Sequence, residues 1–440
     1  MSWTYHPELL ATPVPRYTSY PTAAEFAGDV DRSDLEAALA GVGADDPLSL
    51  YLHIPYCHEI CWYCGCNTGA ANRTHRLATY LEALKAEIGL VAARLNGRGR
   101  VGRIAFGGGS PNAITPAQFA ELLANVRTAF AADQADISIE LDPRSLESTW
   151  LQAIAQARIA RASLGVQTLD PAIQAAIDRV QPLALIEEAV VGLRKAGVTS
   201  LNFDLMYGLP GQDAVVLEST LRETIRLRPE RIALFGYAHV PHLIPRQRQI
   251  DDSALPDGTE RFRQAELGHR LLTDAGYQPV GFDHYALPSD SMAQAAKDGT
   301  LRRNFQGFTD DPSDVLIGLG ASAISQFPGL LAQNDKNAGR YRMQVAAELL
   351  PVERGVVRTA ADQRRGRIIE ELLCQGEALV TGLLDGSTRE RLQPFVDGGF
   401  VRLADDRLTL EADAQPYARV IAAIFDDYRQ PQARRFSSAL

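Results

Sequence analysis

Short runs in which hydrophobic and polar side chains alternate recur through the middle of the chain, and amphipathic stretches separate them. Alternation is typical of β-strands, because successive side chains of a strand point to opposite faces of the sheet. After the first run, Leu77, Leu81 and Leu84 have the spacing of one helix face. Such repeated strand–helix units predict an α/β fold with a parallel sheet and right-handed crossovers. The predicted strands cover residues 48–54, 103–106, 137–141, 162–167, 201–207 and 231–237.

The polar positions of these strands distinguish a barrel from an open sheet. A sheet covered by helices on both faces is nearly apolar throughout, and a closed eight-stranded barrel fills its interior with branched apolar residues. Polar stripes on several strands instead predict a wet interior that holds a ligand. We therefore expect a partial (β/α)6 barrel with its site inside. The stripes consist of Ser49, Tyr51, His53, Ser138, Glu140, Ser163, Gln167, Asn202 and Asp204.

The sequence predicts three parts. Residues 1–47 should form an N-terminal extended arm and helix, because the prolines of the arm disfavour a helix there. Residues 48–335 should form the barrel with the catalytic site. Residues 336–440 should form a C-terminal, mainly helical, winged-helix-like domain, with a helix at 365–374 and a hairpin at 400–410. The hairpin is rich in acidic residues, which argues against DNA binding.

The composition excludes several classes of protein. The chain has 440 residues, of which 46% are hydrophobic and 22% charged, as in soluble globular proteins. No run approaches the roughly 18 apolar residues of a membrane span, and the net charge of −10 argues against a nucleic-acid partner. The five cysteines are odd in number and mostly clustered, so they form no disulfide framework and indicate a reducing cytoplasm. We expect a monomer.

Four of the cysteines lie within ten residues, at positions 57, 61, 64 and 66. Thiolates are the soft ligands that iron–sulfur clusters and zinc select. Zinc would normally require paired C-x-x-C knuckles or a histidine that completes four ligands. Cys57, Cys61 and Cys64 on one loop therefore favour a 4Fe–4S cluster whose fourth iron is open to a small molecule. A zinc knuckle and unrelated buried thiols are the alternatives.

Two further patterns follow the predicted strands. Residues 107–109 are three glycines directly after the second strand, where the backbone could approach a ligand closely, although a tight turn is the alternative. Glu140, Gln167 and Asp204 lie at or near the carboxyl ends of three strands, where α/β barrels place their chemistry. The alternative for each is a satisfied side chain or a helix cap, and Arg179 could be a surface arginine.

The cysteine spacing, the glycine turn and the partial barrel resemble the radical S-adenosylmethionine (SAM) enzymes. Within them the chain is similar to the oxygen-independent coproporphyrinogen III oxidase family of haem biosynthesis, over nearly its full length from Pro15 to residues 435–437. The additional cysteine, Cys66, is part of this resemblance. The other specific segments are residues 15–22, 204–210, 237–239, 283–285, 303–307 and 323–325.

The resemblance implies cofactors and a role for each matched residue. Cys57, Cys61 and Cys64 would hold a 4Fe–4S cluster whose open iron is completed by one SAM. Cys66, Tyr51 and Glu140 would be catalytic. The contacts of that first SAM would be Tyr51, Gly108, Glu140 and the Ile324 backbone. A second SAM would be bound by Tyr63, Gly109, Ser110, Gln167, Arg179, Asp204 and the Ala238 backbone.

The resemblance also implies a reaction. A deoxyadenosyl radical would start the oxidative decarboxylation of two propionates of coproporphyrinogen III to vinyl groups, giving protoporphyrinogen IX. Such an oxidoreductase requires a reducing electron donor, which the sequence does not identify. A haem-binding carrier and a radical SAM methyltransferase are the alternatives, and the arm motif together with Cys66 favours the oxidase over the carrier.

The substrate carries carboxylates, so arginines should attract it to a chain of negative net charge. Arg16 in the arm is the first candidate, and Arg302 or Arg303 is the second. The alternative for Arg16 is that its side chain only fixes the arm to the barrel.

Overall fold

Six parallel strands form the centre of a twelve-stranded sheet in the computed structural model, which describes residues 3–71 and 74–429. Residues 435–437, where the sequence resemblance ends, lie outside the described residues. All six predicted strands are confirmed, each within one to three residues of the expected bounds. These strands are β1 (Pro47–Ile54), β4 (Arg100–Gly108), β5 (Asp136–Leu141), β6 (Arg161–Gln167), β7 (Ser200–Tyr207) and β8 (Arg231–Gly236).

The sheet is an open barrel. On one side β13 (Val315–Leu319) pairs in parallel with β1, and on the other β10 (His284–Ala286) pairs antiparallel with β8. The sheet ends at β16 and β9, which do not pair with each other in the described part of the chain. The prediction of a partial rather than a closed barrel is therefore confirmed. The remaining strands of the sheet are β14 (Ile324–Phe327), β15 (Leu330–Asn334), β16 (Val352–Val357) and β9 (Gln278–Val280).

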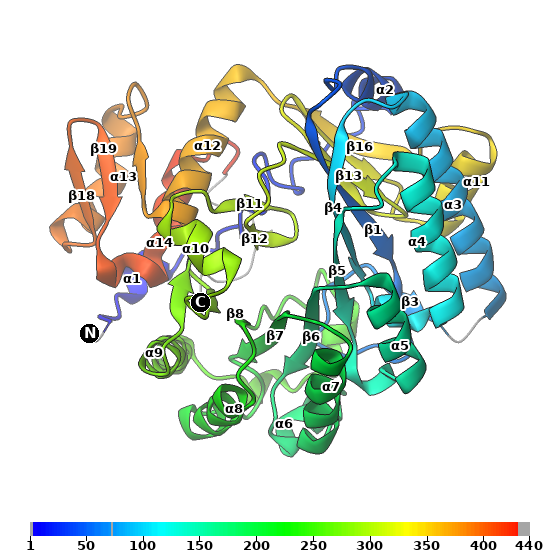
Figure 1. The fold of residues 1–440 in the computed structure, drawn as a ribbon. Helices are drawn as coiled ribbons and strands as arrows, with labels where there is room; N and C mark the ends of the chain where they lie inside the picture. The colour runs from blue at the N-terminus through cyan, green and yellow to red at the C-terminus, as the bar shows by residue number, and fades with distance from the viewer. Residues whose placement is uncertain (1–2, 72–73, 430–440) are drawn as a thin grey trace.

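Helices cover the outer face of the curved sheet, and the C-terminal unit lies beyond its open side (Figure 1). The predicted helix after the first strand is α3 (Thr74–Leu95), whose Leu81, Leu84 and Ile88 are buried against the sheet. Thr115 begins α4 with a capping box, because its side chain accepts from Gln118 N and the Gln118 side chain accepts from Thr115 N. The outer helices after α3 are α4 (Pro116–Phe130), α5 (Ser148–Ala157), α6 (Pro171–Ala176), α7 (Leu183–Lys195), α8 (Ala214–Leu227) and α9 (Gly258–Asp274).

The N-terminal segment connects the barrel to the C-terminal unit. Tyr17 Oη donates to Asp426 Oδ2 at 2.9 Å, and Arg303 Nε donates to the Tyr17 carbonyl at 3.0 Å. The predicted C-terminal helix and hairpin are present as α12 (Ala360–Gln375) and β18–β19 (Val401–Ala404 and Arg407–Leu410). The hairpin and β17 (Glu377–Leu379) form a three-stranded sheet, as in a winged helix.

The predicted boundaries between the three parts stay predictions. The pairing of β16 with β15 carries the barrel sheet beyond residue 335.

No helix of the described residues is long and apolar enough to cross a membrane. The other elements are α1 (Pro7–Leu10), α2 (Arg32–Ala40), β2 (Tyr56–Cys57), β3 (Gly69–Ala70), α10 (Ser291–Lys297), β11 (Arg302–Asn304), β12 (Gly307–Thr309), α11 (Ala338–Ala346), α13 (Gly386–Asp397), α14 (Ala418–Ala422), and the 3-10 helices η1 (Pro111–Ala113), η2 (Pro143–Ser145), η3 (Pro245–Gln249), η4 (Asp252–Ala254), η5 (Ala412–Tyr417) and η6 (Ala423–Phe425).

Candidate active site

The cysteine loop, residues 57–66, begins at the end of β2 and is held by hydrogen bonds to its backbone. Trp62 N donates to the Ile177 carbonyl at 3.1 Å, and Gln247 Nε2 donates to the Tyr63 carbonyl at 2.9 Å. Within the loop, Cys61 is buried, and Cys66 is exposed at its far end. The loop is therefore anchored at its centre, between the second and third predicted cluster ligands.

The first three thiols of the loop share one environment. The pKa of Cys57 is raised to about 12 by burial and by the charges of Cys64, Asp142 and Cys61. Cys66 N donates to Cys64 Sγ at 3.4 Å, and a hydrogen bond from Cys66 lowers the pKa of Cys64. No three His, Cys, Asp or Glu side chains in the described ranges converge on one point as a single bound ion requires. A cluster spreads its thiolate ligands over separate irons, so the three thiols remain a suitable donor set for one.

The three glycines after β4 allow close approach between elements. A Cβ atom on Gly107 would lie 2.7 Å from the Glu140 carboxylate. A Cβ atom on Gly109 would lie 2.6 Å from the carbonyl oxygen of Tyr56. This oxygen is a backbone atom, so it cannot easily move aside. Gly108 has a φ of 114° and its N–H donates to Glu140 Oε2 at 3.2 Å. The glycine run therefore brings the start of the cysteine loop and Glu140 against one backbone segment.

Glu140 and Asp204 are neighbouring carboxylates on the inner face of the barrel. The Glu140 side chain is open to the cavity, yet the surrounding protein atoms and the charge of Asp204 raise its pKa to about 7. Asp204 accepts a hydrogen bond from Ser163 Oγ and another from Asn202 Nδ2, each at 2.8 Å. Burial raises the pKa of Asp204 as well. A cationic ligand would relieve the repulsion between the two carboxylates.

Arg179 lies between β6 and the cysteine loop. Its Nη2 donates to the Gly165 carbonyl at 2.6 Å, and its Nη1 lies 3.3 Å from Cys61 Sγ. Gln167, at the end of β6, is buried. Its φ is 64°, a backbone conformation that residues other than glycine rarely adopt. Arg179 is therefore a buried part of the site and not a surface arginine.

Ser110 and Tyr51 already have partners within the protein. The Ser110 side chain is buried, bonds to Asn112 Oδ1 and accepts from Asp142 N at 3.2 Å. Tyr51 Oη lies 3.1 Å from Nδ1 of His53, whose Nε2 lies 3.3 Å from Ser322 Oγ. These contacts fix the orientation of the Ser110 and Tyr51 side chains within the protein.

The backbone positions expected to contact SAM lie at the ends of neighbouring strands. The Ala238 carbonyl, just after β8, accepts from Gln247 Nε2 at 3.0 Å. Ile324 is the first residue of β14. Its carbonyl oxygen packs closely against Gly318, because a Cβ atom on Gly318 would lie only 2.4 Å from this oxygen. The predicted residues of both SAM sites are therefore distributed around the carboxyl ends of the strands.

A cavity of about 340 Å³ occupies the inside of the barrel. Its amino-terminal end is lined by Asp310, whose carboxylate forms ion pairs with Arg103 and Arg161. The predicted polar stripe is confirmed, because most of its members line this cavity. These members are Ser49, Ser138, Glu140, Ser163, Asn202 and Asp204.

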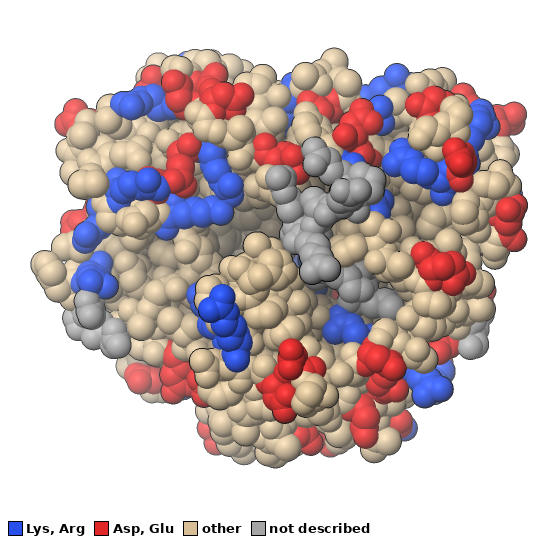
Figure 2. Space-filling model, turned by 180° about the vertical axis from the view of Figure 1, so that it is seen from behind, with Lys and Arg blue, Asp and Glu red and all other residues tan. Residues whose placement is uncertain are grey.

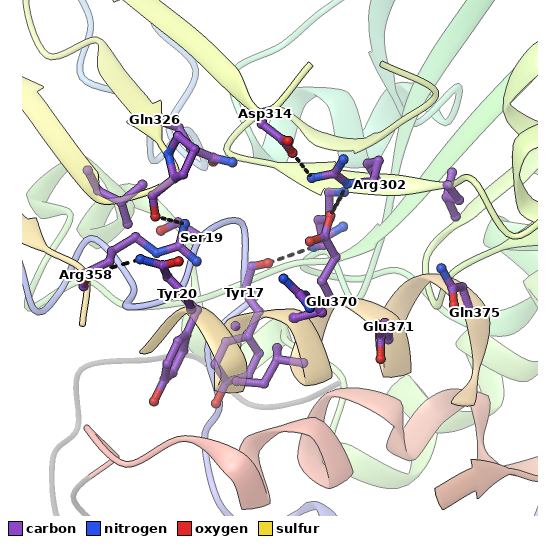
Figure 3. Close-up of a pocket in the computed structure, with 18 residues that line it drawn as sticks. Tyr17, Ser19, Tyr20, Arg302, Asp314, Gln326, Arg358, Glu370, Glu371 and Gln375 are labelled. Atoms are coloured by element: carbon purple, nitrogen blue, oxygen red, sulfur yellow. Dashed lines mark hydrogen bonds and ion pairs between the residues drawn. The ribbon is translucent and has the colours of Figure 1, made fainter. Parts of the chain in front are cut away.

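The three arginines expected to bind substrate do not line this cavity. Arg16 Nη2 donates to the Gly236 carbonyl at 3.0 Å, and its guanidinium lies over the Phe235 ring. Arg302 and Arg303 line a separate pocket of about 410 Å³ between the arm, the sheet and α12. In this pocket Arg302 is paired with Asp314 and Glu370 (Figure 3). On the rear face, basic side chains of the described residues gather in a band at the left of the view, and acidic side chains are more numerous below it (Figure 2).

The sequence reasoning missed three residues that contact the cysteine loop, Arg144, Arg246 and Gln247, and also Asp142, which pairs with Arg144 and Arg179 beside the loop. Asp142 and Arg144 follow the predicted strand 137–141 directly, so the strand-end rule would have found them if extended by a few residues. Arg246 and Gln247 are on η3, where no sequence pattern marks them. Arg246 Nη1 donates to Thr68 Oγ1 at 3.0 Å, and its Nη2 lies 3.4 Å from the Cys66 carbonyl.

Residues 51–224 match the model of the radical SAM superfamily. The open barrel with its cysteine loop is thus that of a radical SAM enzyme, a class that uses a 4Fe–4S cluster and SAM. The oxygen-independent coproporphyrinogen III oxidase of Bradyrhizobium diazoefficiens is 42% identical over 97% of each chain. That of Escherichia coli K12 is 35% identical over 96% of this chain and 94% of its own. This chain belongs to the oxygen-independent coproporphyrinogen III oxidase family.

The solved structures include a near-complete match. The structure of coproporphyrinogen III oxidase from Escherichia coli, described as a radical SAM enzyme, superposes with a TM-score of 0.91 at 34% identity. The match covers 98% of this chain and all of that one. The agreement includes the N-terminal arm and the C-terminal unit, because a barrel alone could not give this coverage.

The residues of the site fit the cofactors of the class. Three thiols share one environment, and two guanidinium groups contact Cys61 Sγ, which suits thiolate ligands. The glycine run leaves a backbone surface without side chains, where a ligand can approach. Carboxylates and amides line the cavity behind it and can bind the polar groups of SAM.

Proposed function

We propose that the protein catalyses the oxygen-independent oxidative decarboxylation of coproporphyrinogen III to protoporphyrinogen IX, converting two propionates to vinyl groups. The observation that carries this proposal is the similarity to named oxidases over nearly the whole chain, at 35–42% identity. The arm motif and Cys66, beside Cys64 in the loop, support the oxidase over a haem carrier. A cytoplasmic location and a monomeric state belong to the same proposal.

Cys57, Cys61 and Cys64 would hold the cluster, and its chemistry with SAM supplies the radical that removes hydrogen from the substrate. Tyr51, Gly108, Glu140 and the Ile324 backbone would bind the SAM at the cluster. Glu140 suits this role, because its raised pKa falls when a cationic group binds near its carboxylate. The ion pairs of Asp310 with Arg103 and Arg161 place charged groups at the amino-terminal end of the cavity.

The proposal also includes a second SAM molecule, bound next to the first. It would contact Tyr63, Gly109, Ser110, Gln167, Arg179, Asp204 and the Ala238 backbone. The position of these groups around one end of the barrel supports it, as does the acidic pair of Asp204 and Glu140. Equilibrium binding to anaerobically reconstituted protein should give two SAM per chain. A stoichiometry of one would contradict this part.

The contacts of Arg16 favour a role in fixing the arm over a direct role in binding the substrate. Its guanidinium contacts the Gly236 carbonyl and the Phe235 ring at the end of β8. Arg302 and Arg303 remain candidates for substrate carboxylates only through the pocket beside α12. Arg16→Ala should therefore lower stability, with unchanged substrate dependence in the protein that remains folded.

Product analysis tests the proposed reaction. Reconstituted protein, coproporphyrinogen III, SAM and a chemical reductant are incubated without oxygen. We expect two molecules of carbon dioxide for each molecule of divinyl product. Tight haem binding without turnover would favour the carrier alternative, and a methylated product would favour the methyltransferase alternative. The natural electron donor is identified separately, by replacing the chemical reductant with cell fractions.

A further inference from the structure

Arg144 contacts the central thiol of the cysteine loop. It lies on η2, directly after β5, and its side chain is only 10% exposed. Its Nη2 lies 3.4 Å from Cys61 Sγ. Neither the sequence patterns nor the roles implied by the family resemblance include this arginine. The contact joins residues 83 positions apart in the chain, so it is a product of the fold.

The guanidinium is held in place from two sides. Asp142 accepts from Arg144 Nε at 3.0 Å and from Nη2 at 2.7 Å, and Glu59 Oε2 accepts from Nη1 at 2.7 Å. Asp142 Oδ1 also accepts from Arg144 N at 3.0 Å, which caps η2. A group fixed in this way presents its N–H bonds to the sulfur without further loss of side-chain freedom.

The three predicted ligands differ in the donors that surround them. Cys61 Sγ is within reach of two guanidinium groups, those of Arg144 and Arg179. Cys64 Sγ accepts from the backbone N–H of Cys66. Hydrogen bonds to the sulfurs of an iron–sulfur cluster set its reduction potential, because they stabilise the additional negative charge of the reduced form.

We propose that Arg144 is a positioning and tuning residue for the cluster: its hydrogen bond to Cys61 Sγ makes the bound cluster easier to reduce. The proposal rests on the cluster ligands of the proposed function. Reduction adds one electron from an external one-electron reductant to the bound cluster. No bond to Arg144 forms or breaks. Arg179 contributes a similar contact, but its expected role toward SAM makes it unsuitable for a clean test.

The test is a redox titration of anaerobically reconstituted full-length protein, without SAM or substrate, at matched iron content. Arg144→Met should give a more negative midpoint potential, seen as a several-fold lower ratio of reduced to oxidised cluster at a fixed solution potential. Arg222→Met is the matched control, because Arg222 carries the same charge in an exposed pair with Glu218 on α8. It should leave the potential at the wild-type value.

An unchanged potential in Arg144→Met overturns the proposal. An equal shift in Arg222→Met also overturns it, because the loss of one positive charge anywhere on the protein would then explain the change in potential. If Arg144→Met does not retain the cluster, Arg144→Lys decides, because an ammonium cannot donate to Asp142 and Cys61 as the planar fork does. Its potential should be lower than the wild-type value, and equality with it would refute the tuning role. The titration needs no porphyrinogen, so its outcome is independent of whether the proposed reaction occurs.

Discussion

Gln247 Nε2 lies 2.9 Å from the carbonyl oxygen of Tyr63, although 184 positions separate the two residues. The same amide nitrogen donates to the Ala238 carbonyl, and Gln247 Oε1 accepts from Val240 N at 2.6 Å. One buried side chain thus joins the cysteine loop to the segment after β8. Both joined residues, Tyr63 and Ala238, belong to the proposed second SAM site.

Gln247→Ala should therefore weaken the binding of the second SAM more than that of the first. The loss of a buried amide with three hydrogen bonds should also cost about 1–3 kcal/mol of stability. Calorimetric SAM titration and thermal unfolding measure the two effects. Gln249→Ala, an exposed position on the same 3-10 helix, is the control and should change neither. Equal weakening of both SAM molecules would argue against this selective role.

Replacement of any one of Cys57, Cys61 and Cys64 by serine should abolish the iron–sulfur absorbance of the reconstituted protein, because a hydroxyl is a poor replacement for a thiolate ligand. Cys66→Ser should retain that absorbance but lose most turnover, in line with a catalytic role. Visible spectra and iron content, with Cys374→Ser as the control at a buried cysteine of α12, provide the measurement. Loss of the cluster in Cys66→Ser would make Cys66 a ligand.

Asp204→Asn should weaken SAM binding while folding and cluster content are retained. The substitution removes the negative charge, and it places an amide next to the Ser163 and Asn202 groups that now donate to the carboxylate. The expected loss is about tenfold in affinity, as for a charged hydrogen bond of roughly 1.5 kcal/mol. Equal SAM affinity in variant and wild type would mean that Asp204 only organises the polar stripe.

Gly109→Ala should destabilise the protein by about 1–3 kcal/mol, because the added Cβ would meet the Tyr56 carbonyl oxygen at 2.6 Å. The matched control is Gly102→Ala, within β4, the strand that ends just before Gly109, because a Cβ on Gly102 would meet nothing within 4 Å. Thermal unfolding of the two variants compares them directly. Similar melting temperatures for both would show that the backbone relaxes around Gly109.

Glu87 should make stability depend on pH. Burial raises its pKa to about 7, although it accepts hydrogen bonds from Tyr341, Gly320 and Asn334. The folded state therefore binds more protons than the unfolded state between pH 4.5 and 7, so stability falls as the pH rises through this window, by on the order of 3 kcal/mol.

Glu87→Gln should remove this part of the pH dependence. Thermal unfolding of the two proteins from pH 5 to pH 8 provides the measurement, with the exposed Glu82→Gln on the same helix as the control. If wild type and Glu87→Gln lose stability in parallel over this range, the dependence belongs to other groups.

Local patterns in the sequence were sufficient for the strands and the cysteine loop. The alternation of residues 201–207 places Asn202 and Asp204 on one face of β7 in any sheet, because the side-chain period of a strand is two. Polar side chains on that face could not be packed under helices, which is why the partial barrel with a polar interior was predictable. The spacing of Cys57, Cys61 and Cys64 is likewise a property of one short loop.

The partners of individual side chains were decided only by the tertiary structure. Arg144 reaches Cys61 and Gln247 reaches Tyr63 because the loops after β5 and β8 meet at the carboxyl ends of the strands, across 83 and 184 positions of sequence. The sequence marks Arg302 as a candidate for a substrate carboxylate, but only the fold shows that Glu370 and Asp314 lie beside its guanidinium. A sequence determines which groups are present and their local order, but a long side chain binds whatever the path of the chain brings within its reach.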